Sequence, residues 1–123
     1  MYLVDSSIWI DHFRKSNPRL VQALTDQLVM CHPFIIGELA LGSLKDRQTV
    51  ISMLQALPQA AKADDDEVLK LIETQGLFSR GLGLIDAHLI ASALIEGDVK
   101  IWTGDKRLAA ISDEMNLGGM PVI

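Results

Sequence analysis

Short apolar segments alternate with capped helices along this chain, and that alternation constrains its fold more than any other feature. Tyr2–Val4 is apolar and short, and Ser6 or Ser7 can cap the helix that follows it to about Phe13. The predicted strands are residues 2–4, 29–32, 60–63, 100–103 and 121–123, and further helices are predicted from Pro18, from Pro33 to Leu41, after Asp46, from Asp64, over residues 85–96 and over residues 105–114. This order predicts a three-layer α/β/α sandwich with a short, mostly parallel central sheet.

Length and composition favour one soluble domain over residues 1–123. The chain has 123 residues, of which 49% are hydrophobic and 22% are charged, and its formal net charge is −5. That charge argues against a protein coated in positive charge for nucleic acid, although a local basic rim stays compatible with it. A single cysteine, Cys31, excludes an internal disulfide. Since neither a signal peptide nor a membrane span is evident, we expect a cytoplasmic protein with no membrane partner.

Four acidic residues stand in apolar or tight-turn surroundings, where a hydrated charge is not expected. They are Asp5, Glu38, Asp86 and Asp105. A poorly hydrated carboxylate is unfavourable unless it is paired or binds a cation. Asp5 and Asp105 directly follow predicted strands, and sites of parallel sheets lie at the carboxyl ends of their strands. We therefore expect the four carboxylates to meet and to hold a hard divalent cation.

Each acid also has a simpler interpretation. Asp5 and Asp86 can cap the helices that follow them, and Asp105 suits an ordinary turn and cap. Glu38 lies inside a predicted helix, so it is not a cap, but it can face solvent on the outer stripe. Taken together, the unusual surroundings of all four acids favour a shared metal site over four separate simple roles. Oxygen ligands favour Mg²⁺ or Mn²⁺ over zinc, and the three histidines have no metal-ligand spacing.

At these residues the chain resembles a PIN domain, and more closely a VapC-type toxin of a toxin–antitoxin pair. The matching segments are VDSSIWI from Val4, IGEL from Ile36, GLIDAHLIA from Gly83 and TGDKRL from Thr103. The resemblance implies a metal-dependent endoribonuclease whose catalytic and metal-binding residues are Asp5, Glu38, Asp86 and Asp105, supported by Ser6 and Thr103. It also implies an RNA substrate, a VapB-like antitoxin that covers the active groove, and a homodimer. His88 departs from the family pattern, which has an aliphatic or small residue there.

Other residues leave alternatives open. Lys106 and Arg107 either bind the substrate backbone or are solvated residues at a helix start. Trp9 and Phe13 share one helical stripe, which favours core packing over a partner-binding patch. Two other functions compete with the nuclease: a PIN-like RNA- or protein-binding module with a degraded site, and a phosphoacceptor receiver domain. The receiver domain gives Glu38 no role, and Lys106 follows its strand too late for the lysine that such a domain needs.

Overall fold

A computed structural model describes residues 1–119 and places a small parallel sheet at the centre of the chain. The sheet contains β1 (Tyr2–Val4), β2 (Val29–Met30) and β3 (Lys100–Trp102) in the order β2-β1-β3. Leu3 lies opposite Met30 on one side and opposite Ile101 on the other. All three strands run parallel, so their carboxyl ends open on one edge, as the sequence predicts.

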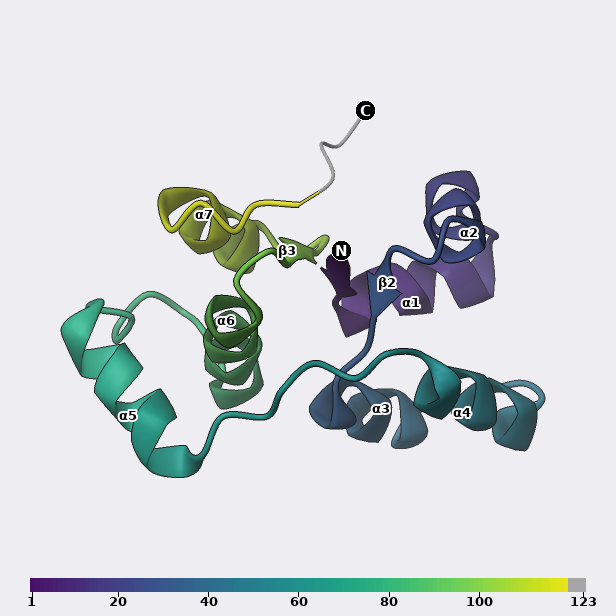
Figure 1. Cartoon of the computed structure of the whole chain (residues 1–123). Helices are drawn as coiled ribbons and strands as arrows, with labels where there is room; N and C mark the ends of the chain where they lie inside the picture. Colours follow the sequence, from purple (N-terminus) through teal and green to yellow (C-terminus); the bar gives the residue numbers. More distant parts are fainter. Residues whose placement is uncertain (120–123) are drawn as a thin grey trace.

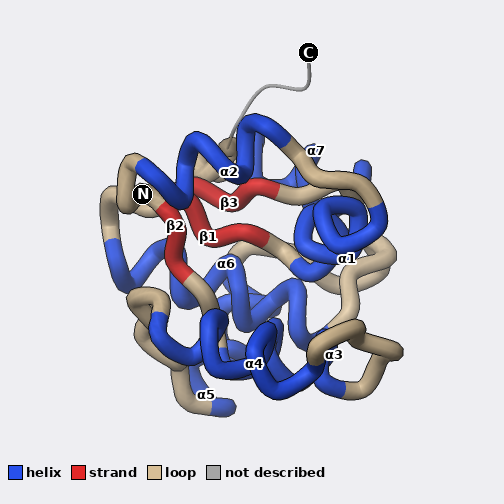
Figure 2. Tube along the Cα trace, turned by 90° about the vertical axis from the view of Figure 1, so that its right-hand side faces the viewer, coloured by secondary structure: helices blue, strands red, loops and turns tan. Residues whose placement is uncertain are grey.

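Helices cover both faces of this sheet. They are α1 (Ser6–Arg14), α2 (Pro18–Thr25), α3 (Pro33–Ala40), α4 (Arg47–Ala56), α5 (Asp65–Thr74), α6 (Leu84–Glu96) and α7 (Lys106–Glu114). Figures 1 and 2 both place α2 and α7 above the strands and α3, α4 and α6 below them, with α5 outside α6. The predicted α/β/α sandwich is confirmed. Within residues 1–119, no helix is both long and apolar enough to cross a bilayer.

Local chemistry explains where the helices begin and end. Asn17 caps α2 by accepting from the Arg19 and Leu20 amides. Asp64 and Glu67 form a capping box at the start of α5, because each side chain accepts from the backbone of the other. α6 ends at Gly97, whose φ of 88° is readily adopted only by glycine.

The core lies between the sheet and the helices. Leu3, Trp9, Ile90 and Leu108 have no exposed surface, and they come from β1, α1, α6 and α7. Every residue of α6 from Ala87 to Ala93 is buried, as expected for a helix whose side chains are mostly apolar on every face. The sheet edge and the start of α6 are thus fixed by the same core.

Three expectations differ from the structure or fall outside it. Residues 60–63 form no strand, because Gln59 makes only a single bridge, to Cys31, and the chain then leaves the sheet. The sequence predicts Asp46 as the cap of α4, but Asp46 has a φ of 52° and makes no cap hydrogen bond through its side chain. The strand predicted at residues 121–123 lies outside the described residues.

Candidate metal centre and active site

Asp5 is the most firmly held acid of the candidate site. It follows β1 and is only 6% exposed. Its Oδ1 accepts from the Ser6 amide at 2.7 Å, and its Oδ2 accepts from the hydroxyls of Thr103 at 2.6 Å and Ser7 at 3.0 Å. We expected Ser6 or Ser7 to cap α1, and this prediction is wrong: Asp5 is the cap. One carboxylate therefore starts the helix and also faces the sheet edge.

The turn after β3 places Asp105 on the same edge. The Asp105 amide donates to Thr103 Oγ1 at 3.0 Å, so Thr103 links Asp105 to Asp5. Asp105 Oδ1 accepts from the Arg107 and Leu108 amides and caps α7. The cap predicted for Asp105 is thus present, and within residues 1–119 it is made through Oδ1.

Glu38 reaches the site from the middle of α3, a helix that packs against α1. The Ser6 hydroxyl lies 3.3 Å from Glu38 Oε1 and 3.3 Å from Asp5 Oδ1, so it stands between the two acids. Burial raises the pKa of Glu38, and repulsion from Asp5 and, more weakly, from Asp86 adds to the rise, against the hydrogen bond from Ser6. Glu38 does not face away from the other acids, although part of its side chain remains exposed.

Asp86 lies in the first turn of α6, where its Oδ2 accepts from the Gly83 amide at 3.2 Å. Burial raises the pKa of Asp86; the Gly83 bond opposes this, while repulsion from Asp5 and Asp105 adds to it. Asp86 therefore interacts with Asp5, Asp105 and Glu38 at once. The structure brings all four predicted acids to one edge of the sheet, as a group of mutually repelling carboxylates.

The four carboxylates do not form a closed cage. Among residues 1–119, no three His, Cys, Asp or Glu side chains lie close enough together to hold one ion. Mg²⁺ commonly keeps several waters and is held through one or two carboxylates together with substrate phosphates. An open group of oxygen donors fits such a hydrated cation, because its charge relieves the repulsion that, together with burial, raises the pKa of Glu38 and of Asp86.

Ser7 belongs to the site, although the sequence predicts it only as a possible helix cap. Its hydroxyl donates to Asp5 Oδ2 and accepts from the Gly104 amide at 3.0 Å. It thus joins the end of β1 to the end of β3. The pair of serines after Asp5 is the only signal in the sequence, and it suits a helix start equally well.

The two basic side chains considered for substrate binding lie on the surface at the start of α7. Lys106 and Arg107 are both exposed. Arg107 lies against Gly81, where an added Cβ would be 2.7 Å from Arg107 Cδ. Gly81 has a φ of 81°, a backbone conformation that residues other than glycine rarely adopt. Arg107 is therefore placed beside the segment that leads into Asp86.

A groove adjoins the acids on the other side. Its volume is about 480 Å³, and Ile10, Phe13, Arg14, Glu38 and Leu39 are among its lining residues. Trp9 and Phe13, which share one stripe of α1, differ in burial. Trp9 is fully buried, as core packing predicts, whereas Phe13 is 37% exposed. The groove is thus largely apolar, and one of the four acids lies in its wall.

The fold and this acidic edge define a known class of protein. The family model of the PIN domain matches residues 2–114, so the chain belongs to the PIN domain family. Among its relatives is Ribonuclease VapC32 of Mycobacterium tuberculosis, strains CDC 1551 / Oshkosh and ATCC 25618 / H37Rv. Each is 46% identical over 114 residues, which is 93% of this chain and 92% of the relative. The predicted resemblance to a VapC-type PIN domain is confirmed, and the receiver-domain alternative is excluded.

Proposed function

We propose that this protein is an endoribonuclease that hydrolyses RNA phosphodiester bonds with Mg²⁺, or with Mn²⁺ in its place, and that it is the toxin of a type II toxin–antitoxin pair. The observation that carries the proposal is the group of four carboxylates at the sheet edge, in which Glu38 and Asp86 both have raised pKa values. The family and the ribonuclease names of the relatives support the same reaction.

Each part of the site has a distinct task. Asp5, Glu38, Asp86 and Asp105 would hold the hydrated cation together, one or two of them directly and the others through its waters. When bound, the cation offsets charge on the phosphate and activates water. Thr103 and Ser7 keep Asp5 in one orientation through their hydroxyl donors. Lys106 and Arg107 provide positive charge at the rim, where the RNA backbone would pass.

The partner proposals rest on the groove and on the relatives. An apolar groove that is lined by Phe13, Ile10 and Glu38 suits a protein segment that covers the acids. Since VapC toxins pair with VapB antitoxins, a VapB-like antitoxin is the proposed occupant. A homodimer stays a prediction from the resemblance.

The test compares RNA cleavage by the purified protein with and without Mg²⁺, beside two matched variants. Asp86→Asn removes one charge from the site, and Asp98→Asn makes the same change at an exposed residue just before β3, at the opposite edge of the sheet. We expect chelator-sensitive cutting that Asp86→Asn abolishes and Asp98→Asn retains. Equal cutting by all three proteins would indicate a contaminating nuclease. RNA binding without any cutting would instead favour the degraded binding module.

A further inference from the structure

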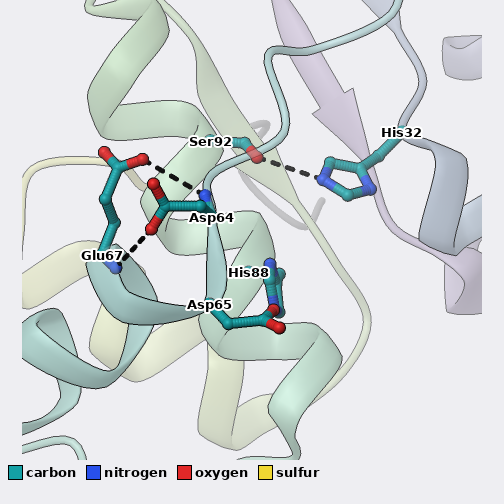
Figure 3. Close-up of polar contacts among 6 residues, drawn as sticks. All are labelled: His32, Asp64, Asp65, Glu67, His88 and Ser92. Carbon is teal, nitrogen blue, oxygen red and sulfur yellow. Dashed lines mark hydrogen bonds and ion pairs between the residues drawn. The ribbon is translucent and has the colours of Figure 1, made fainter.

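A buried polar contact, which includes none of the four site acids, links the start of α3 to α6 (Figure 3). His32 and Ser92 have no exposed surface, and His32 Nε2 lies 3.1 Å from Ser92 Oγ. His32 is also the cap of α3, because its Nδ1 accepts from the Phe34 amide at 3.0 Å. A nitrogen that accepts carries no proton, so Nε2 carries it and donates to Ser92. The ring is thus a neutral bridge with both nitrogens engaged.

The surroundings keep this ring neutral. Burial lowers the pKa of His32 to about 4, and the positive charge of Lys62 and the neighbouring His88 contribute. Phe34 fills the space between the two histidines, with its ring centroid 5.2 Å from that of His32 and 4.8 Å from that of His88. A charged imidazole would lose the acceptor that caps α3. The contact therefore holds in one protonation state over the pH range in which an RNA-cutting enzyme works.

The two helices joined here are the ones that carry Glu38 and Asp86. Glu38 comes six residues after His32, and Asp86 comes six residues before Ser92. At the rise of an α-helix each acid is about 9 Å from the bridge along its own helix. In the described part of the chain no hydrogen bond joins Glu38 to Asp86: Glu38 is bonded through Ser6, and Asp86 through Gly83. Their separation must therefore be set by the placement of the helices.

We propose that His32 is a positioning residue whose bond to Ser92 fixes α3 against α6 and thereby sets the spacing of Glu38 and Asp86 for the cation. The inference rests on the proposed metal-dependent function. Neither residue contacts the acids, so both act only through the helices. Removing the bond leaves two repelling carboxylates with one fewer constraint on their separation.

Ser92 offers a matched pair of variants. Threonine and valine have nearly the same shape, and only threonine keeps the hydroxyl. Any cost of the added methyl group in this buried position is common to Ser92→Thr and Ser92→Val. A second route is His32→Asn, because asparagine caps helices well but is too short to reach Ser92. The asparagine variant keeps the cap and loses the bridge.

The experiment measures Mn²⁺ binding to the chain by calorimetry, together with the unfolding temperature without metal and the rate of RNA cleavage. Supporting groups around metal ligands typically change affinity 10- to 100-fold, so we expect Ser92→Val and His32→Asn to weaken Mn²⁺ binding about tenfold. Ser92→Thr should bind nearly as tightly as the parent. The double variant His32→Asn/Ser92→Val should bind no more weakly than the weaker single variant, because both remove one bond.

Equal Mn²⁺ affinity of Ser92→Thr and Ser92→Val, with only the unfolding temperature lowered in the latter, would assign the contact a purely structural role and overturn the proposal. Failure of the function itself looks different: the parent protein would then neither bind Mn²⁺ nor cut RNA, whichever residue stands at position 92. If Ser92→Val does not fold, His32→Asn decides by the same comparison, with undiminished Mn²⁺ affinity counting against a positioning role.

Discussion

The two halves of the acidic site are held very differently. On the sheet side, Asp5 is 6% exposed, and its two oxygens accept from the Ser6 amide and from the hydroxyls of Ser7 and Thr103. On the helix side, which consists of Glu38 and Asp86, the hydrogen bonds to the described residues are fewer. Glu38 accepts from the Ser6 hydroxyl at 3.3 Å, and Asp86 accepts from the Gly83 amide. The sheet side is therefore organised before any cation arrives, whereas the helix side keeps unrelieved repulsion.

This difference suggests a division of labour. A carboxylate that is already hydrogen-bonded in place needs little rearrangement to bind a cation. A carboxylate with a raised pKa competes with protons for the cation to a higher pH. The sheet side is expected to determine whether the site works at all. The helix side is expected to determine how strongly it depends on metal concentration and pH.

The largest effect is expected for Asp5→Asn. Asparagine is as good a helix cap as aspartate, so α1 should still form, and the circular dichroism spectrum should not change. The variant lacks the charge at the centre of the site, and its loss of cleavage should exceed the roughly 100-fold that supporting residues reach. Single-turnover cleavage of one RNA at saturating Mg²⁺ measures it. A variant that cuts within about tenfold of the parent would show that the sheet side does not dominate.

Glu38→Gln tests the helix side and should have a smaller effect on cleavage, about 10- to 100-fold. It should also stabilise the metal-free protein at neutral pH, because it removes one of the repelling charges. The gain should stay below about 1 kcal/mol, since Glu38 is partly exposed and water screens its charge. Urea unfolding in the presence of a chelator measures this, and Glu73→Gln, exposed on α5, is the matched control. If Glu38→Gln left the free energy of unfolding unchanged, Glu38 would repel Asp5 and Asp86 less than their placement indicates.

The pH dependence follows from the raised pKa values of Glu38 and Asp86. The folded, metal-free protein holds these protons to a higher pH than the unfolded chain, in which carboxyls titrate near about 4. The stability that they contribute is therefore full below that value and is lost as pH rises through the folded pKa values. Mg²⁺ competes with the same protons, so the half-saturating Mg²⁺ concentration should rise as pH falls through this range.

Two measurements check this prediction: the unfolding temperature against pH in a chelator, and the Mg²⁺ dependence of cleavage against pH. Glu38→Gln should flatten both curves. A half-saturating Mg²⁺ concentration that does not change with pH would show that neither Glu38 nor Asp86 must lose a proton to bind the cation.

The two halves also differ in how well the sequence predicts them. Asp5 and Asp105 are predictable because each directly follows a strand, and parallel strands end on one edge. Glu38 and Asp86 required the further assumption that α3 and α6 turn their acids toward that edge. Periodicity does not reveal which face of a buried helix meets which neighbour, and for this reason the His32–Ser92 contact could not be predicted.

Other misses share a physical cause. Ser7 was interpreted as a cap because a serine after a strand suits that role, but Asp5 takes it and frees the Ser7 hydroxyl to join β1 to β3. The segment 60–63 has strand-like composition, yet its contact with the sheet is an isolated bridge between Gln59 and Cys31, in which the Ala60 amide donates to the Cys31 carbonyl. In both cases tertiary contacts overrode a local preference.

Thr103→Val offers the finest test of the sheet side, and we expect the smallest loss there. Thr103 is 8% exposed, donates to Asp5 at 2.6 Å and accepts from the Asp105 amide at 3.0 Å. Valine keeps the shape and removes both bonds, so cleavage should fall about tenfold, while Thr103→Ser, which keeps the hydroxyl, should stay close to the parent. If valine and serine variants cut equally well, the bonds from Ser6 and Ser7 suffice to orient Asp5. The orientation of Asp5 would then depend on Ser6 and Ser7 at the start of α1 and not on Thr103 after β3.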